Sequence, residues 1–187
     1  MDSGASSYRR FLAGDDSGMV ELIRDYKDGL LLYLNSFLNN ISLAEDCVQE
    51  VFIRLAIKKP KFREDSAFKT WLYAIGRNLA VDMLRKQHSH LALDEVAELA
   101  DMHSLEQAYL REEQKIQLHQ AIQKLKPEYQ QVIYLSYFQE FSNEQSAKIM
   151  HKTRKQIENL LYNARKALKS ELEKEGVSYE DLSTDGI

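Results

Sequence analysis

The sequence predicts an all-α protein with two small helical domains joined by a flexible acidic linker, the second domain containing a helix-turn-helix. Only 2 prolines and 7 glycines occur in 187 residues, which favours helices over a turn-rich β-protein. Apolar residues recur three and four positions apart in successive segments. Charge alternates along the chain, with two basic segments on either side of an acidic one. These three observations set the fold class and the domain order.

The first domain is predicted over residues 8–90, with three long helices. The first runs from Asp16 to Leu38. The second begins at Ser42, which forms a capping box with Glu45, and ends before Pro60. Asp65 or Ser66 is expected to cap the third. Each helix has a predicted buried face. In the first helix it consists of Val20, Ile23, Leu30, Leu31, Leu34 and Leu38, and in the second of Ala44, Cys47, Val48, Val51, Phe52, Leu55 and Ala56. In the third it consists of Phe68, Trp71, Leu72, Ile75, Leu79, Met83 and Leu84.

Residues 91–110 are predicted to be the acidic linker and residues 111–175 the second domain. A helix ends by Lys126, and Pro127 suits the first turn of the next helix. Val132, Ile133, Leu135 and Phe138 are expected to be buried in that next helix. Ser142 then caps a short helix, and a long basic helix follows from Thr153. Gly176 is expected to end this last helix, which leaves 176–187 as a tail.

The net charge of −4 hides the two basic segments. Residues 58–86 contain eight basic side chains against three acidic ones, and residues 148–169 contain seven against one. A solvated helix face explains one such segment, but two that flank an acidic linker indicate contact with nucleic acid.

The sequence offers no catalytic or metal-binding motif. Its five histidines lack zinc spacing, and it has no phosphate-binding glycine loop and no GxSxG motif. We therefore expect a binding protein, not an enzyme, without metal or other cofactor. The single cysteine fits a reducing cytoplasm. The polar N-terminal segment predicts no signal peptide, and the longest apolar run is too short to insert in a membrane.

Aromatic and cationic residues interleave between Lys59 and Gln87, a mixture that suits single-stranded nucleic acid. Phe52, Phe68 and Trp71 lie on the apolar stripes and are expected in the core. Phe62 and Tyr73 lie off the stripes and are expected to be exposed.

The segments AEDCVQEVFIRL and FREDSAFKTWLYAIGRNLAVDMLRK resemble the first domain of bacterial extracytoplasmic-function (ECF) sigma factors of the sigma-70 family. The segment LKPEYQQVIYLSYFQEFSNEQSAKIM, followed by NARKAL, is similar to the helix-turn-helix domain of the same family. The resemblance covers most of the chain.

The resemblance implies three sets of contacts and three partners: core RNA polymerase, promoter DNA and an anti-sigma factor. Polymerase contacts would come from Asp46, Gln49, Glu50 and Arg54. Recognition of the −10 element and its melted strand would involve Lys61, Phe62, Arg63, Ser66, Lys69, Tyr73, Arg77 and Asn78. The duplex −35 element would meet Lys152, Thr153, Arg154, Lys155, Gln156, Asn159 and Arg165.

This sequence departs from the family pattern mainly in the second domain. Met150 and His151 replace the usual Leu-Gly turn, Ser146 is a polar residue at a core position, and Glu158 stands where Lys is common. Two other functions stay open at this point. A stand-alone helix-turn-helix regulator would explain the last helix but not residues 42–86, and a helical RNA-binding enzyme would need a catalytic cluster.

Overall fold

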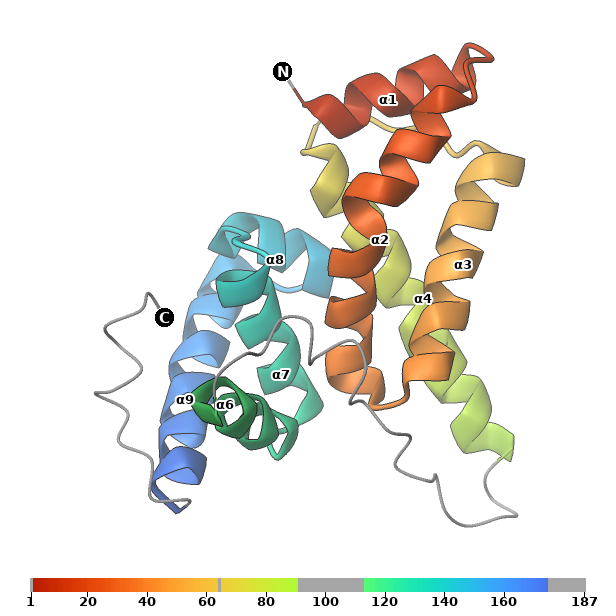
Figure 1. Ribbon diagram of the computed structural model, residues 1–187. Coiled ribbons are helices and arrows are strands. Elements are labelled where there is room, and N and C mark those ends of the chain that lie inside the picture. Colours follow the sequence, from red (N-terminus) through yellow and green to blue (C-terminus); the bar gives the residue numbers. More distant parts are fainter. Residues whose placement is uncertain (1, 64, 91–112, 175–187) are drawn as a thin grey trace.

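The computed structural model describes residues 2–63, 65–90 and 113–174 of the chain, and their regular structure is entirely helical. The first group of helices is α1 (Ser3–Leu12), α2 (Ser17–Leu38), α3 (Ile41–Lys58) and α4 (Phe68–His90). The second is α6 (Glu113–Gln123), α7 (Pro127–Ile133), the π-helical turn η1 (Tyr134–Phe138), α8 (Asn143–Met150) and α9 (Arg154–Lys174). Figure 1 shows these two groups side by side. The all-α prediction is confirmed, whereas the predicted linker, Gly176 and the tail lie outside the described residues.

Helix α1 is a part of the first domain that the sequence analysis missed. The side chain of Asp2 caps it by accepting a hydrogen bond from the backbone of Ala5. Tyr8 and Phe11 are buried, and the Tyr8 hydroxyl donates to the Pro60 carbonyl at 2.7 Å. A Cβ at Gly18 would lie 2.2 Å from the Ser7 carbonyl oxygen, so the close packing of α1 on α2 requires glycine there.

The core of the first domain forms between α2, α3 and α4, largely from the predicted stripes. Two predicted core residues of α2 are instead exposed, Val20 by 65% and Ile23 by 37%, whereas Leu22 in the same turn is buried. Cys47 is fully buried, and its thiol donates to the Gly76 carbonyl at 3.6 Å. The expected helix–helix role of Cys47 is therefore confirmed.

Two predicted helix caps were wrong. Helix α3 is capped by Asn40, whose side chain accepts a hydrogen bond from the backbone N–H of Leu43, so Ser42 already lies inside the helix. Neither Asp65 nor Ser66 caps α4. Its first backbone N–H, that of Phe68, donates to Asp2 at 2.6 Å instead. The cap of α4 thus comes from a residue far away in the sequence, which local pattern reasoning does not detect.

The second domain is a helix-turn-helix supported by α6 and α7. Pro127 opens α7 as predicted. The helix then widens into η1, and this change of pitch leaves the predicted core residue Phe138 38% exposed. Ser142 caps α8 as expected, and the structure adds a capping box with Gln145. His151 adopts the left-handed conformation (φ 53°) in the turn before α9, the geometry expected where the family has glycine.

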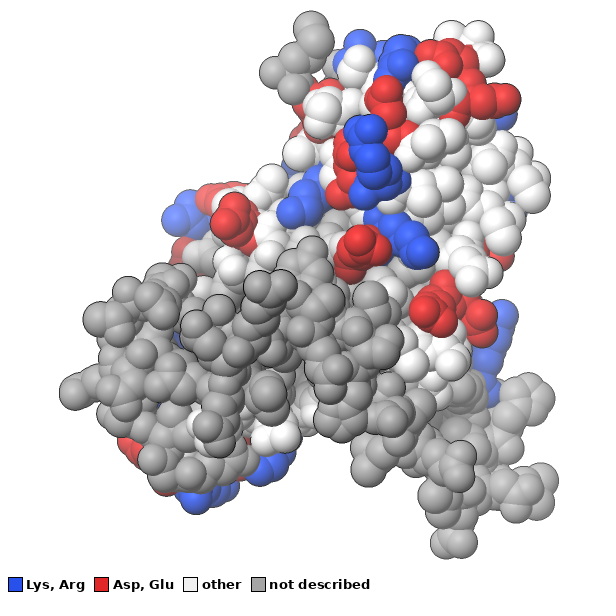
Figure 2. Space-filling view, in the orientation of Figure 1, with Lys and Arg blue, Asp and Glu red and all other residues white. Residues whose placement is uncertain are grey.

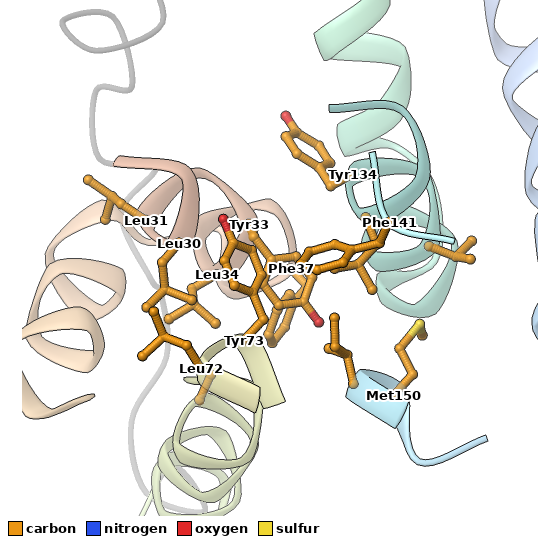
Figure 3. Close-up of a cluster of buried hydrophobic side chains, with 14 of the residues drawn as sticks. Leu30, Leu31, Tyr33, Leu34, Phe37, Leu72, Tyr73, Tyr134, Phe141 and Met150 are labelled. Carbon is orange, nitrogen blue, oxygen red and sulfur yellow. The ribbon is translucent and has the colours of Figure 1, made fainter. Parts of the chain in front are cut away.

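The two domains pack against each other through α4 with α8 and α2 with α7. In Figure 3, Phe141 and Met150 of the second domain point toward a group of side chains that includes Tyr33, Phe37 and Tyr73 of the first. All five are buried. This contact places the second domain over one face of α4.

Candidate nucleic-acid and polymerase interfaces

The loop before α4 presents one aromatic ring between two exposed cations. Phe62 is half-buried, with its ring centroid 5.6 Å from that of Phe68 and 5.2 Å from that of Trp71. Lys61 and Arg63 are exposed on either side of it. The loop therefore has the components of a stacking platform for a nucleobase, although Phe62 is less exposed than predicted.

Four of the predicted −10 residues lie along one side of α4. Lys69, Tyr73 and Arg77 follow one another at four-residue spacing, so they lie on one face, and Asn78 is next to Arg77. The predicted exposure of Tyr73 was wrong. It is 1% exposed, because the second domain covers this part of α4.

All four of these side chains bond to the second domain. Lys69 Nζ donates to the Gln139 carbonyl (2.9 Å), and Tyr73 Oη donates to Gln139 Oε1 (2.6 Å). Arg77 Nε donates to Gln131 Oε1 (2.9 Å). His151 Nε2 lies 2.9 Å from Asn78 Oδ1. Burial lowers the pKa of Lys69 and raises the pKa of Tyr73, because each loses water around its charged form.

The N-terminus of α9 is held in a second capping box. The side chain of Thr153 accepts from the backbone N–H of Gln156 (3.2 Å), and Gln156 Oε1 accepts from the backbone N–H of Thr153 (2.8 Å). Arg154 is also engaged, with Glu158 at 2.8 Å and Glu144 at 2.6 Å. These carboxylates raise the pKa of Arg154, first through the hydrogen bond that Arg154 donates to Glu158. Arg154 thereby links α9 to α8.

Two further predicted −35 residues attach α9 to the rest of its domain. Lys152 Nζ lies 3.0 Å from a carboxylate oxygen of Glu128 at the start of α7. Arg165 Nε donates to the hydroxyl of Tyr137 in η1, and its guanidinium lies over the same ring. These contacts fix the angle of α9, while Lys155 and Asn159 project from it, exposed, with no hydrogen-bond or ion-pair partner among the described residues.

Sequence reasoning missed an aromatic residue on this helix. Tyr162 is 68% exposed and follows Lys155 by seven positions and Asn159 by three, so the three side chains share one face. The helical spacing of Tyr162 from Lys155 and Asn159 was the feature of the sequence that could have identified it.

Helix α3 presents the predicted polymerase residues. Asp46 and Gln49 are exposed, and Arg54 lies 3.7 Å from Glu50. A hollow of about 180 Å³ between α2 and α3 is lined by Lys27, Leu31, Glu45, Val48 and Gln49. Figure 2 shows mostly uncharged surface over the C-terminal end of α3. Acidic side chains lie toward its N-terminal end.

Two apolar residues on this helix were also missed. Ile53 is 49% and Ile57 is 75% exposed. Ile53 follows Glu50 by three positions and precedes Ile57 by four, so one face of α3 combines acidic and apolar side chains. Apolar side chains left exposed next to charged ones are typical of a protein–protein interface.

Two of the polar side chains buried in the second domain are Ser146 and Gln130, and Ser146 departs from the family pattern. Ser146 is fully buried, and its hydroxyl has no hydrogen-bond partner within the described parts of the chain. Gln130 is also buried, but its amide donates to the carbonyls of Gln123 (2.8 Å) and Leu125 (2.9 Å), which fixes the turn between α6 and α7. Among the described residues Gln130 lacks a partner only for its Oε1, whereas the Ser146 side chain has none, so Ser146 is the less favourable of the two for stability.

Within residues 2–63, 65–90 and 113–174, no group of three or more potential ligands is placed to hold a metal ion. No described helix is long and apolar enough to cross a bilayer.

A helix-turn-helix domain joined to a helical domain with an aromatic and basic face defines a class of DNA-binding protein with two separate contact surfaces. Residues 22–90 match the family Sigma-70 region 2, and residues 115–168 match Sigma-70, region 4. The chain is 30% identical to the ECF RNA polymerase sigma factor SigW of Bacillus subtilis, over 85% of this chain and 91% of that protein. It is 31% identical to the RNA polymerase sigma-H factor of Pseudomonas aeruginosa, over 88% and 91% of the two chains.

Two solved structures share the fold across both domains. One is CnrH in complex with the cytosolic domain of CnrY, with a TM-score of 0.64 at 21% identity over 92% of this chain and 96% of that one. The other is the sigma factor RpoE of Bartonella quintana in complex with the anti-sigma factor NepR, with a TM-score of 0.62 at 19% identity over 88% and 98%.

The chain therefore belongs to the extracytoplasmic-function class of the sigma-70 family. It is a sigma factor that binds core RNA polymerase, recognises promoters and promotes DNA melting. A stand-alone helix-turn-helix regulator is not favoured, because that reading leaves the region 2 match unexplained.

Proposed function

We propose that this sigma factor divides promoter recognition among three surfaces. The loop 61–66 and α4 bind the melted −10 strand, α9 binds the −35 duplex, and α3 binds the polymerase. The observation that carries this proposal is the line of Lys69, Tyr73 and Arg77 on α4, with Phe62 in the loop before it. Cations at helical spacing follow a phosphate backbone, while an aromatic ring beside them stacks on an unpaired base.

For the −35 element, Lys155 and Asn159 are the side chains best placed to reach base edges. Both project from the first turns of α9, the part of a recognition helix that enters the major groove. Tyr162 shares their face and adds an apolar contact. The other predicted −35 residues are bonded within the domain: Lys152, Thr153, Arg154, Gln156 and Arg165. Their role is to hold α9 at its angle, and their remaining donors contact phosphates.

For the polymerase, the exposed Asp46 and the half-buried Glu50 supply charge, and Ile53 and Ile57 supply apolar area. Gln49 and Arg54 complete the same side of α3. An interface that combines buried apolar anchors with a charged rim gives both affinity and orientation.

The protein acts by binding and not by catalysis, in the cytoplasm where transcription takes place. We also propose that an anti-sigma factor holds it inactive. Two proteins of the same fold support this, because RpoE was solved with an anti-sigma factor and CnrH with the cytosolic domain of CnrY.

The proposal is tested by transcription in vitro with core RNA polymerase and a library of genomic promoters. The wild-type chain is expected to direct initiation at a defined promoter subset. Phe62→Leu keeps apolar packing on Phe68 and Trp71 but removes the stacking ring. It should reduce permanganate reactivity of the melted region by about tenfold, since a base stack contributes roughly 1–3 kcal/mol.

Core binding by Phe62→Leu, measured by co-purification, serves as its control and should equal that of the wild type. Full melting by this variant would remove Phe62 from the strand-binding surface. Failure of the wild-type chain to initiate anywhere would reject the whole assignment of surfaces.

A further inference from the structure

We propose that α1 holds the loop that carries Phe62 in the shape that receives a base, and that Tyr8 is a positioning residue for binding of the melted strand. This inference rests on the proposed role of Phe62 as a stacking ring. It adds the element that keeps this ring ready before DNA arrives. The region 2 match begins at residue 22, so α1 lies before it, and its role follows from its own contacts.

Two side chains of α1 hold the first residues of this loop. The Tyr8 hydroxyl donates to the carbonyl of Pro60, two residues before Phe62, at 2.7 Å. Burial raises the pKa of Tyr8 to about 12, so its hydroxyl stays protonated as a donor at neutral pH. The ammonium of Lys59 lies 5.1 Å from the ring centroid of Phe11. Successive positions of the loop are therefore tied to α1.

Tyr8 also contacts the two rings on which Phe62 packs. Its ring centroid lies 5.5 Å from that of Phe68 and 5.6 Å from that of Trp71. Phe68 and Trp71 are themselves 5.5 Å apart, and both contact Phe62. These four rings form one cluster in which Tyr8 is 1% exposed. A displacement of α1 would therefore reach Phe62 through direct ring contacts.

The first turn of α1 holds the start of α4. Asp2 accepts a hydrogen bond from the backbone N–H of Phe68. A Cβ at Gly4 would lie 2.6 Å from Cδ1 of the Phe68 ring, so this close approach of α1 to α4 requires glycine. The same helix thus fixes the chain on both sides of Phe62.

The loop itself has little backbone structure. Among residues 60–63, in the part of the chain that the structure describes, no hydrogen bond joins two backbone groups. Lys148 of α8 donates to the carbonyl of Asp65, so the residues nearest Phe62 depend on α1. A loop held by a few side chains opens locally at a low free energy. Ordering the ring in advance lowers the entropy cost of stacking a base on it.

The first test uses Trp71, the single tryptophan of the chain, as a probe of this cluster in the free full-length protein. Acrylamide quenching of its fluorescence measures how far the cluster opens. Tyr8→Phe keeps the ring and removes the hydroxyl, and Gly4→Ala pushes α1 away from Phe68. Tyr129→Phe, at a half-buried tyrosine of α7, is the matched control. Circular dichroism confirms that each variant keeps its helices.

Tyr8→Phe should increase the population of the loosened loop about twofold to tenfold, the factor for one ordinary hydrogen bond. Quenching of Trp71 should rise accordingly. Gly4→Ala should change it in the same direction, because α1 then loses its contact with the start of α4. Tyr129→Phe should match the wild type.

The second test measures DNA melting by the holoenzyme, formed from each variant and core RNA polymerase, on a promoter that the wild type uses. Permanganate reactivity of the −10 region should fall about twofold to tenfold in Tyr8→Phe. Co-purification with core polymerase and protection of the −35 duplex should equal those of the wild type, because these surfaces lie on α3 and α9. A general loss of stability would not separate melting from these two activities.

Unchanged quenching in both Tyr8→Phe and Gly4→Ala would overturn the proposal that α1 holds the loop. A looser loop with full melting, or a melting defect without a looser loop, would overturn the positioning role of Tyr8. The proposed stacking role of Phe62 fails in a different variant: full melting by Phe62→Leu rejects it, whatever the quenching of Trp71 shows.

Discussion

Asp2 Oδ2 accepts a hydrogen bond of 2.6 Å from the backbone N–H of Phe68, so the second residue of the chain caps a helix that begins 66 residues later. The other carboxylate oxygen accepts from Ala5 at 3.1 Å and caps α1. One side chain therefore fixes the starts of two helices, directly beside the loop that carries Phe62.

Asp2→Ala should lower the free energy of unfolding by about 1–2 kcal/mol, because both helix starts lose a side-chain acceptor. Asn has one acceptor oxygen, so Asp2→Asn should fall between Ala and the wild type. Urea denaturation followed by circular dichroism measures both values. Equal stability of all three proteins would show that the cap has no thermodynamic weight.

Ser146→Ala should stabilise the protein by about 1 kcal/mol, since a buried hydroxyl without a partner carries a desolvation cost that alanine does not. Thermal unfolding detects this as a higher Tm. Ser170→Ala, on the exposed side of α9, is the control and should change Tm little. A lower Tm for Ser146→Ala would mean that this hydroxyl makes a favourable contact in solution.

Lys155→Ala should weaken recognition of −35-dependent promoters by about 1–3 kcal/mol, the range for loss of a base-edge contact. Transcription from promoters that differ only in the −35 element measures the effect. An equal loss on every sequence would identify Lys155 as a phosphate contact.

Arg154→Ala is the comparison for Lys155, because Arg154 is already bonded to Glu144 and Glu158. Substitution of Arg154 should reduce binding to all −35 sequences by loosening α9 from α8. A change of sequence preference in this variant would instead show that Arg154 leaves its two carboxylates and contacts bases.

Ile57→Asp should leave folding intact, because this side chain is 75% exposed, but should weaken polymerase binding about tenfold or more. Analytical gel filtration with core enzyme gives the affinity. Leu12→Asp changes an apolar residue of α1 that is 41% exposed and serves as the control. Undiminished binding of Ile57→Asp would remove the apolar end of α3 from the polymerase interface.

Acid should destabilise the second domain through His119. Burial lowers the pKa of His119 to about 4, and its Nδ1 lies 2.7 Å from the Tyr134 hydroxyl. The unfolded chain binds a proton near pH 6.5, whereas the folded chain does not. The free energy of unfolding is therefore undiminished by His119 above pH 6.5. It falls as the pH is lowered from 6.5 toward 4, by up to about 3 kcal/mol.

Denaturation of the wild type and of His119→Gln at pH 7.5, 6.0 and 5.0 measures this dependence. Glutamine keeps a polar side chain that does not titrate in this range, so His119→Gln should have a flatter profile. Identical profiles would assign the acid sensitivity to other groups.

The sequence predicted the helical class, the two-domain order and most of the core, because the apolar stripes of α3 and α4 and the cap residue Ser142 are local patterns. Helix α1 was missed because its polar sequence hides an apolar side made of Ala5, Tyr8 and Phe11. The start of α4 could not be predicted, since its cap, Asp2, is distant along the chain.

The candidate site was less accessible to sequence reasoning, because exposure depends on how the domains meet. Tyr73 lies off the apolar stripe of its own helix, yet Phe141 of the second domain buries it. Phe138 follows the helical period but is exposed, because it is the last residue of η1, where the helical pitch changes. Tyr162 and Ile57 stood on predictable faces and were overlooked.

The burial of Cys47 between α3 and α4 has a practical consequence for studying domain motion. Burial raises the pKa of its thiol to about 12, so the group stays protonated and shielded at neutral pH. Maleimide dyes and spin labels react with accessible thiolates. Cysteines introduced on the outer faces of the two domains can therefore be labelled selectively while the native residue remains in place, and distances across the interdomain contact can be followed without disturbing the core.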